Sequence, residues 1–115
     1  MKYSSFNYVR TFRKRHALSE FELAFLIGQR SDRTIYWYER GDRAPTLKAA
    51  LAFQVLFSQE PHQLFPGLYD AVEEDVMRRA LHMLRQLEGK HDRKSQAKRR
   101  FLEALPRGGA NDIEL

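Results

Sequence analysis

The chain has 115 residues, a length that fits one domain with an appended helix and allows a modest core. It contains no cysteine, which excludes disulfides, thiol nucleophiles and thiolate metal sites. Its formal net charge is +5, and it has neither an apolar run near the roughly 20 residues that span a membrane nor an apolar leader, so we expect a cytoplasmic protein.

A first amphipathic helix is predicted over residues 4–16, with Ser4 or Ser5 as its N-cap. The residues that share one stripe of this helix follow its 3.6-residue repeat. They are Phe6, Val9, Phe12 and Arg13.

A second, shorter helix is predicted to begin at a capping box, in which Ser19 is followed three residues later by Glu22. Gly28 is a natural C-terminal stop for it. We expect its inward side to carry Leu23, Ala24 and either Leu26 or Ile27.

Two further helices complete the first half of the chain. Ser31 can cap a third helix that runs to about Arg40, and Thr46 can cap a fourth with the sequence LKAALAFQVLF. No stretch alternates polar and apolar residues for long, so the sequence predicts an all-α fold.

A long helix is predicted from about residue 68 to residue 88, after Pro66 and Gly67 break the chain and Leu64 and Phe65 close the core. Its apolar residues recur at spacings of three and four, as in the seam of a coiled coil. They are Tyr69, Val72, Val76, Ala80, Met83 and Leu87. One helix cannot bury this seam alone, so we expect it to form a homodimer, the alternative being an additional helix that completes one intramolecular core.

Three regions therefore follow one another along the chain. Residues 1–66 are expected to form a compact domain, and residues 67–105 a helical extension whose last helix, over 90–105, is basic. Residues 106–115 are short, polar and glycine-containing, which predicts a flexible tail.

Two short helices joined by a glycine-containing turn form a helix-turn-helix candidate. Residues 12–57 resemble the lambda-repressor-like family of helix-turn-helix proteins, also called Cro/C1-type or XRE. The matching positions are Arg13 and Leu18; Ser19 with Glu22-Leu23-Ala24; the turn residue Gly28; Thr34-Ile35; Glu39 and Gly41; and Arg43-Ala44-Pro45-Thr46. The resemblance implies a lambda-repressor-like helical bundle, here with a long C-terminal helical extension, from a bacterium or phage.

The resemblance also implies roles for particular residues. Arg13 and Glu39 would form a structural ion pair between the first and third helices. Ile35 and Tyr38 should face the core, which leaves the opposite side of the third helix for the DNA major groove. The candidate base-contacting residues are Asp32, Arg33, Thr34, Tyr36 and Trp37. The candidate phosphate-contacting residues are Ser19, Arg30, Arg40, Arg43 and Thr46.

Some of these residues admit a second interpretation. Asp32 could be a favourable charge at the helix N-terminus, Arg33 a solvated or phosphate-bound side chain, and Trp37 could pack against its own chain.

Charge and side-chain chemistry favour a binding protein over an enzyme. Lys and Arg exceed Asp and Glu by ten to five in residues 1–58 and by seven to two in residues 90–107, which suggests a polyanion partner. The four histidines have no metal-ligand spacing, and neither a paired acid/base site nor a phosphate-binding glycine loop is present, so we expect no cofactor and no metal.

The function predicted from these features is sequence-specific binding of double-stranded DNA by a dimeric transcriptional regulator, most simply a repressor. Two alternatives involve a protein partner. The first is an adaptor that uses the exposed Tyr36 and Trp37, favoured by the acidic Glu20 and Asp32. The second is an antitoxin whose C-terminal helices bind a toxin.

Overall fold

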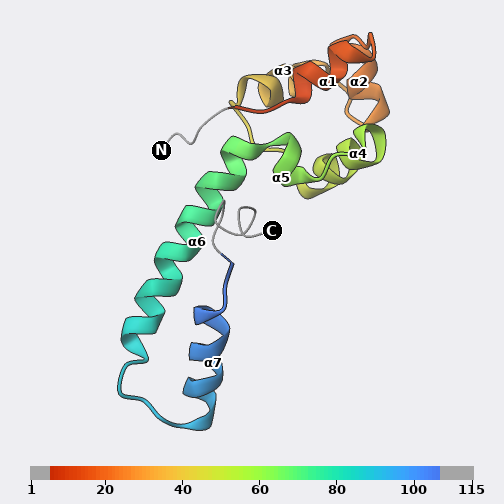
Figure 1. Ribbon diagram of the computed structural model, residues 1–115. Coiled ribbons are helices and arrows are strands. Elements are labelled where there is room, and N and C mark those ends of the chain that lie inside the picture. The colour runs from red at the N-terminus through yellow and green to blue at the C-terminus, as the bar shows by residue number, and fades with distance from the viewer. Residues whose placement is uncertain (1–5, 107–115) are drawn as a thin grey trace. The chain divides into compact units, whose positions relative to one another are not determined.

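The computed structural model describes residues 6–106, which form seven helices and no strand, so the fold is all-α (Figure 1). The chain divides into two compact units, and the division falls after Ala71, within the longest helix. The helices are α1 (Val9–Arg15), α2 (Glu20–Leu26), α3 (Arg33–Arg40), α4 (Leu47–Phe57), α5 (Pro61–Leu64), α6 (Pro66–Gln86) and α7 (Arg93–Glu103).

Helix α1 begins later than predicted, at Val9, and the predicted caps Ser4 and Ser5 lie outside the described residues. The Asn7 side chain accepts a hydrogen bond from the Val9 amide and donates one to the Tyr38 carbonyl. The Tyr8 amide donates to the Leu64 carbonyl at 2.9 Å. These long-range bonds hold residues 7 and 8 outside the helix, which local residue spacing could not reveal.

The helix N-termini of the first unit follow the predicted side-chain caps. The capping box is confirmed, because the Glu22 amide donates to Ser19 Oγ at 3.0 Å and the Ser19 amide donates to the Glu22 carboxylate at 2.9 Å. Thr46 Oγ1 likewise accepts from the Ala49 amide. Ser31 accepts from the Arg33 amide, although the helical residues begin only at Arg33.

Helices α1, α2 and α3 all end with a residue in the left-handed conformation, namely Ala17, Gly28 and Gly41. In each case the amide of the following residue reaches back to a carbonyl five positions earlier, which is the Schellman pattern. These bonds run from Leu18 to Arg13, from Gln29 to Ala24 and from Asp42 to Trp37, at 3.1, 2.8 and 2.9 Å. Glycine adopts this conformation freely, but Ala17 does so at a cost.

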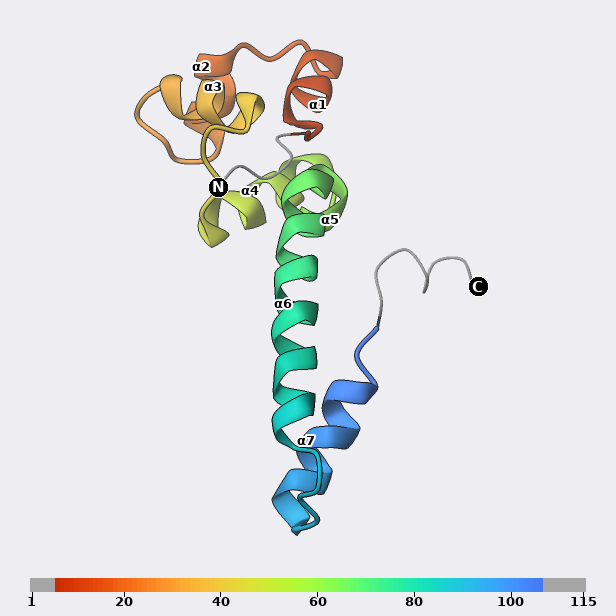
Figure 2. The same cartoon turned by 90° about the vertical axis from the view of Figure 1, so that its left-hand side faces the viewer.

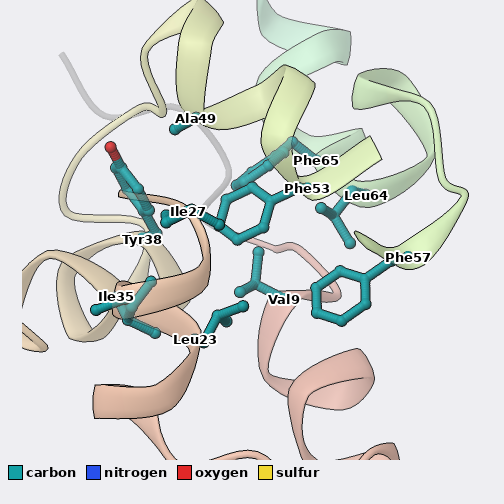
Figure 3. Packing of buried hydrophobic residues seen from close by; sticks show 11 residues of the cluster. Val9, Leu23, Ile27, Ile35, Tyr38, Ala49, Phe53, Phe57, Leu64 and Phe65 are labelled. Carbon is teal, nitrogen blue, oxygen red and sulfur yellow. The ribbon is translucent and has the colours of Figure 1, made fainter. Parts of the chain in front are cut away.

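The core of the first unit is built around Phe53 of α4, whose side chain is fully buried (Figure 3). Its ring lies within about 6 Å of the rings of Tyr38, Phe57 and Phe65, measured between centroids. The predicted closure of the core by Leu64 and Phe65 is confirmed. The other buried members of this cluster are Val9, Leu23, Ala24, Ile27, Ile35 and Ala49.

The connection between α4 and α6 differs from the prediction. A short helix, α5, follows a capping box formed by Glu60 and Gln63. Pro66 and Gly67 were expected to break the chain, but α6 begins at Pro66. The prediction was wrong because a proline in the first turn of a helix loses no hydrogen bond and already has a helical φ.

The second unit contains most of α6, together with α7, which runs back beside the second half of α6 in both views (Figures 1 and 2). The turn between them is held by Arg99, which donates to the carbonyls of Leu87 and Lys90, each at 2.7 Å. Asp92 caps α7 by accepting from the Ser95 amide and hydroxyl, and this bonding lowers the pKa of Asp92.

The predicted apolar seam of α6 is divided by this arrangement. Ala80 and Leu87 are buried within the chain. The remaining members stay exposed; they are Tyr69, Val72, Val76 and Met83.

Two leucines on α2 provide a matched test of this core. Leu23 is fully buried and Leu26 is about half exposed, and the structure selects Ile27 over Leu26 as the inward residue. We expect Leu23→Ala to lower the free energy of unfolding by about 2–5 kcal/mol, because it leaves a cavity. Leu26→Ala should change it by less than about 0.5 kcal/mol. Urea unfolding measures both, and equal losses for the two variants would contradict the assigned orientation of α2.

Candidate nucleic-acid interface

Helix α3 is fixed in place by one buried side. Ile35 is fully buried and Tyr38 nearly so, as predicted, and α3 packs against both α2 and α1. The Tyr38 carbonyl also accepts a 2.9 Å hydrogen bond from Asn7. The opposite side of α3 is consequently held toward solvent in a defined orientation.

Of the five residues predicted to contact bases, four lie on α3 and Asp32 directly precedes it. Asp32, Arg33 and Tyr36 are exposed, whereas Thr34 and Trp37 are half-buried. Thr34 and Trp37 are therefore less accessible to a ligand than the other three.

Trp37 is half-buried partly because Arg43 covers its ring. The Arg43 guanidinium lies 3.7 Å from the ring centroid, a cation–π contact between α3 and the loop that follows it. Trp37 thus packs against its own chain, and Arg43 is positioned by this contact at the edge of the exposed surface.

Arg40 is held by two neighbours on the same side of the molecule. Its Nε donates to Asp42 at 3.1 Å, and its guanidinium lies 5.2 Å from the centroid of the Tyr36 ring. The bond to Asp42 and the interaction with Tyr36 raise the pKa of Arg40. Within residues 6–106, Arg30 and Arg33 have no ion-pair partner, so their full charge faces solvent.

The predicted ion pair between Arg13 and Glu39 is confirmed. Arg13 Nε lies 2.6 Å from Glu39 Oε2, and Nη2 lies 3.3 Å from Oε1, so the contact is bidentate. Arg13 Nη1 also donates to the Leu18 carbonyl at 2.9 Å. Both side chains are about nine-tenths buried, and the hydrogen bond to Glu39 raises the pKa of Arg13.

A hollow of about 580 Å³ lies beside this ion pair. It is lined by residues of α1, the start of α2 and α3: Arg10, Arg13, Lys14, Ser19, Glu20, Tyr36, Glu39 and Arg40. Four bases face two acids. Because Arg13 pairs with Glu39 and Arg40 with Asp42, the lining bases without an ion-pair partner in the described part of the chain are Arg10 and Lys14. The hollow therefore suits an anion, and Glu20 is the one acidic residue in its lining that has no ion-pair partner among residues 6–106.

Arg10 and Lys14 were missed by the sequence analysis. They lie four residues apart on α1, so they project from the same side of that helix. This spacing of two bases around the buried Arg13 was a usable signal, but only the fold shows that Tyr36 and Arg40 face the same space.

The predicted phosphate-contacting residues do not form one cluster. Ser19 and Arg40 line the hollow, and Arg43 lies over Trp37. Arg30 is exposed in the turn between α2 and α3, and Thr46 uses its hydroxyl to cap α4.

No protein-family model matches this chain, and no curated protein or solved structure is significantly similar to it. Among the residues that the structure describes, no three histidine or acidic side chains gather as a metal site would require. No helix in that part of the chain combines the length and apolar character needed to cross a membrane.

The Arg13–Glu39 pair leads to a stability prediction. Glu39→Ala leaves the buried Arg13 charge without its partner, so we expect a loss of roughly 3 kcal/mol in the free energy of unfolding. Arg13→Met/Glu39→Leu removes both charges and should recover most of that loss. Because the pKa of Arg13 is raised, the contribution of its charge to stability is present at neutral pH and is lost as the pH rises through that pKa. Urea unfolding at neutral pH tests this, and a double variant no more stable than Glu39→Ala would contradict it.

Proposed function

We propose that this protein is a sequence-specific DNA-binding transcriptional regulator of the lambda-repressor-like helix-turn-helix class, most simply a repressor that occludes polymerase. The observation that carries the proposal is the environment of Arg33. This arginine projects without an ion-pair partner from a helix that is anchored on its other side, and a basic hollow lies beside the same helix. An exposed helix with a flanking basic surface matches the requirements of the major groove and its phosphates.

In this proposal α3 enters the major groove, and Arg33 donates two hydrogen bonds to a guanine. Asp32 either accepts from a cytosine amino group or remains a favourable charge near the start of α3. Arg10, Lys14 and Arg40 hold backbone phosphates, which set the register of α3 without specifying sequence. The exposed part of the α6 seam supports action as a homodimer that reads two half-sites of an inverted repeat. This role places the protein in the cytoplasm of a bacterium or in a phage-infected cell.

The test is selection of duplexes from a random-sequence pool by the purified protein. It is done at near-physiological salt, because at low salt any basic surface binds DNA without sequence preference. We expect enrichment of an inverted repeat whose half-sites are about 10 base pairs apart. If the folded protein enriches no motif, the proposal is wrong.

One observation favours a second function, a protein-interaction adaptor. Phe21 and Phe25 lie four residues apart on α2, and they are 65% and 75% exposed. Exposed aromatic side chains that share one helix side are typical of protein contacts. A selection that yields no DNA motif would direct attention to this side of α2.

Substitutions in the two parts of the interface should have different effects on DNA binding. Arg33→Ala removes a base contact, so we expect the preference for the selected motif over random DNA to fall by about 1–3 kcal/mol. Arg10→Ala/Lys14→Ala removes two phosphate contacts, so binding to all duplexes should weaken equally. The slope of log affinity against log salt should then become shallower by about two units.

Arg15→Ala is the matched control for the α1 variant. It removes a positive charge from the same helix, but Arg15 lies over the Phe12 ring and is not part of the hollow. Its salt slope should stay close to that of the unaltered protein. Equal slopes for the control and the Arg10→Ala/Lys14→Ala variant would show that the hollow is not part of the DNA interface.

A further inference from the structure

The described residues of the second unit leave two apolar surfaces uncovered. On α6, Val72 and Val76 lie four residues apart and are each about half exposed. On α7, Phe101 is 66% exposed, and Ala97 lies one turn before it and is also exposed. We call the first pair the α6 face and the second pair the α7 face.

Helix α7 cannot cover the α6 face of its own chain while it keeps its observed contacts. Its inward side carries the buried Ser95 and also Arg99, which binds the carbonyls of Leu87 and Lys90 in the turn that follows α6. Ala97 and Phe101 lie on a different side of α7 from Ser95. The α7 face therefore points away from the helix that α7 contacts.

The two faces carry opposite charges. Residues 72–76 contain three acids and no base, whereas residues 93–101 contain five bases and no acid. Within the described part of the chain, only one of the three acids forms an ion pair, Asp75 with Arg78. Among the five bases, only Arg99 has a hydrogen-bond partner there. Glu73 lies beside the α6 face, and Lys94, Lys98 and Arg100 lie beside the α7 face, so these charges would attract one another.

We propose that the α7 face of a second copy of this chain packs on the α6 face, and that a two-fold axis generates the same contact in reverse. Each chain supplies one face of each kind, so a single symmetric dimer covers all four and leaves none for further association. Pairing α6 in parallel with its own copy would instead bring the acids of residues 72–76 together. The inference rests on the dimer of the proposed function and specifies how that dimer is built.

Disulfide trapping tests the pairing directly, because the chain contains no cysteine of its own. A Val76→Cys chain is mixed with a Phe101→Cys chain and oxidised, and the products are separated without reductant. We expect a cross-linked heterodimer from the mixture and little cross-linking of either variant alone. Self-linking of Val76→Cys without the heterodimer would overturn the proposal, since it would show α6 against α6.

Leu81→Cys is the matched control for this experiment. Leu81 is on α6 and is about half exposed, like Val76, but it lies on a different side of the helix. Mixed with Phe101→Cys, it should cross-link at least tenfold less than Val76→Cys does. Equal cross-linking of the two would mean random collision and would also overturn the proposal.

Charge reversal gives an independent test by sedimentation equilibrium. We expect Glu73→Lys/Asp75→Lys and Lys94→Glu/Lys98→Glu each to weaken the dimer at least tenfold, and the four changes together to restore it. Circular dichroism confirms that each variant keeps its helices. A combined variant as weak as its parents would overturn the proposal. Neither experiment uses DNA, so failure to dimerise in this way is distinguishable from failure to bind an operator.

Discussion

The arrangement of the first unit depends on the buried guanidinium of Arg13. It binds the Glu39 carboxylate at the end of α3 and the Leu18 carbonyl in the turn before α2. The Arg13 carbonyl also accepts a hydrogen bond from the Leu18 amide, so Arg13 binds both the amide and the carbonyl of Leu18. Because Ser19 follows directly and caps α2, the same contacts fix where α2 begins. This ion pair and the burial of Ile35 and Tyr38 together hold α3 beside the basic hollow.

Local rules accounted for much of the fold. The caps at Ser19 and Thr46 and the helical class follow from short-range spacing, whereas the burial of Ile35 and Tyr38 was implied by the family resemblance. Sequence analysis failed where distant residues compete for the backbone. The Tyr8 amide donates to the Leu64 carbonyl, and α1 begins only at Val9. Helix α5 was not predicted because it is too short to have a periodic pattern.

The sequence could predict which residues of the candidate interface are exposed, but not which neighbours they contact. The exposed positions of Asp32, Arg33 and Tyr36 follow from the helical repeat once Ile35 is assigned to the core. No spacing rule could show that Asp42 binds Arg40 or that Arg43 covers Trp37, because these contacts depend on the course of the loop after α3. The structure therefore leaves Arg33 as the exposed cation of α3 that has no ion-pair partner among the described residues, and it adds a second group of bases on α1.

The left-handed conformation of Ala17 has a consequence for the order of folding. The turns at Gly28 and Gly41 use the residue that adopts this conformation freely, so they can form early from local interactions. Ala17 lacks that freedom, and the Arg13 side chain that binds its turn at Leu18 is itself held by Glu39, 26 positions away in the sequence. Closing so long a loop costs entropy before the ion pair can form. The segment from α2 to α3 is thus able to assemble first, with α1 docking onto it as a later step.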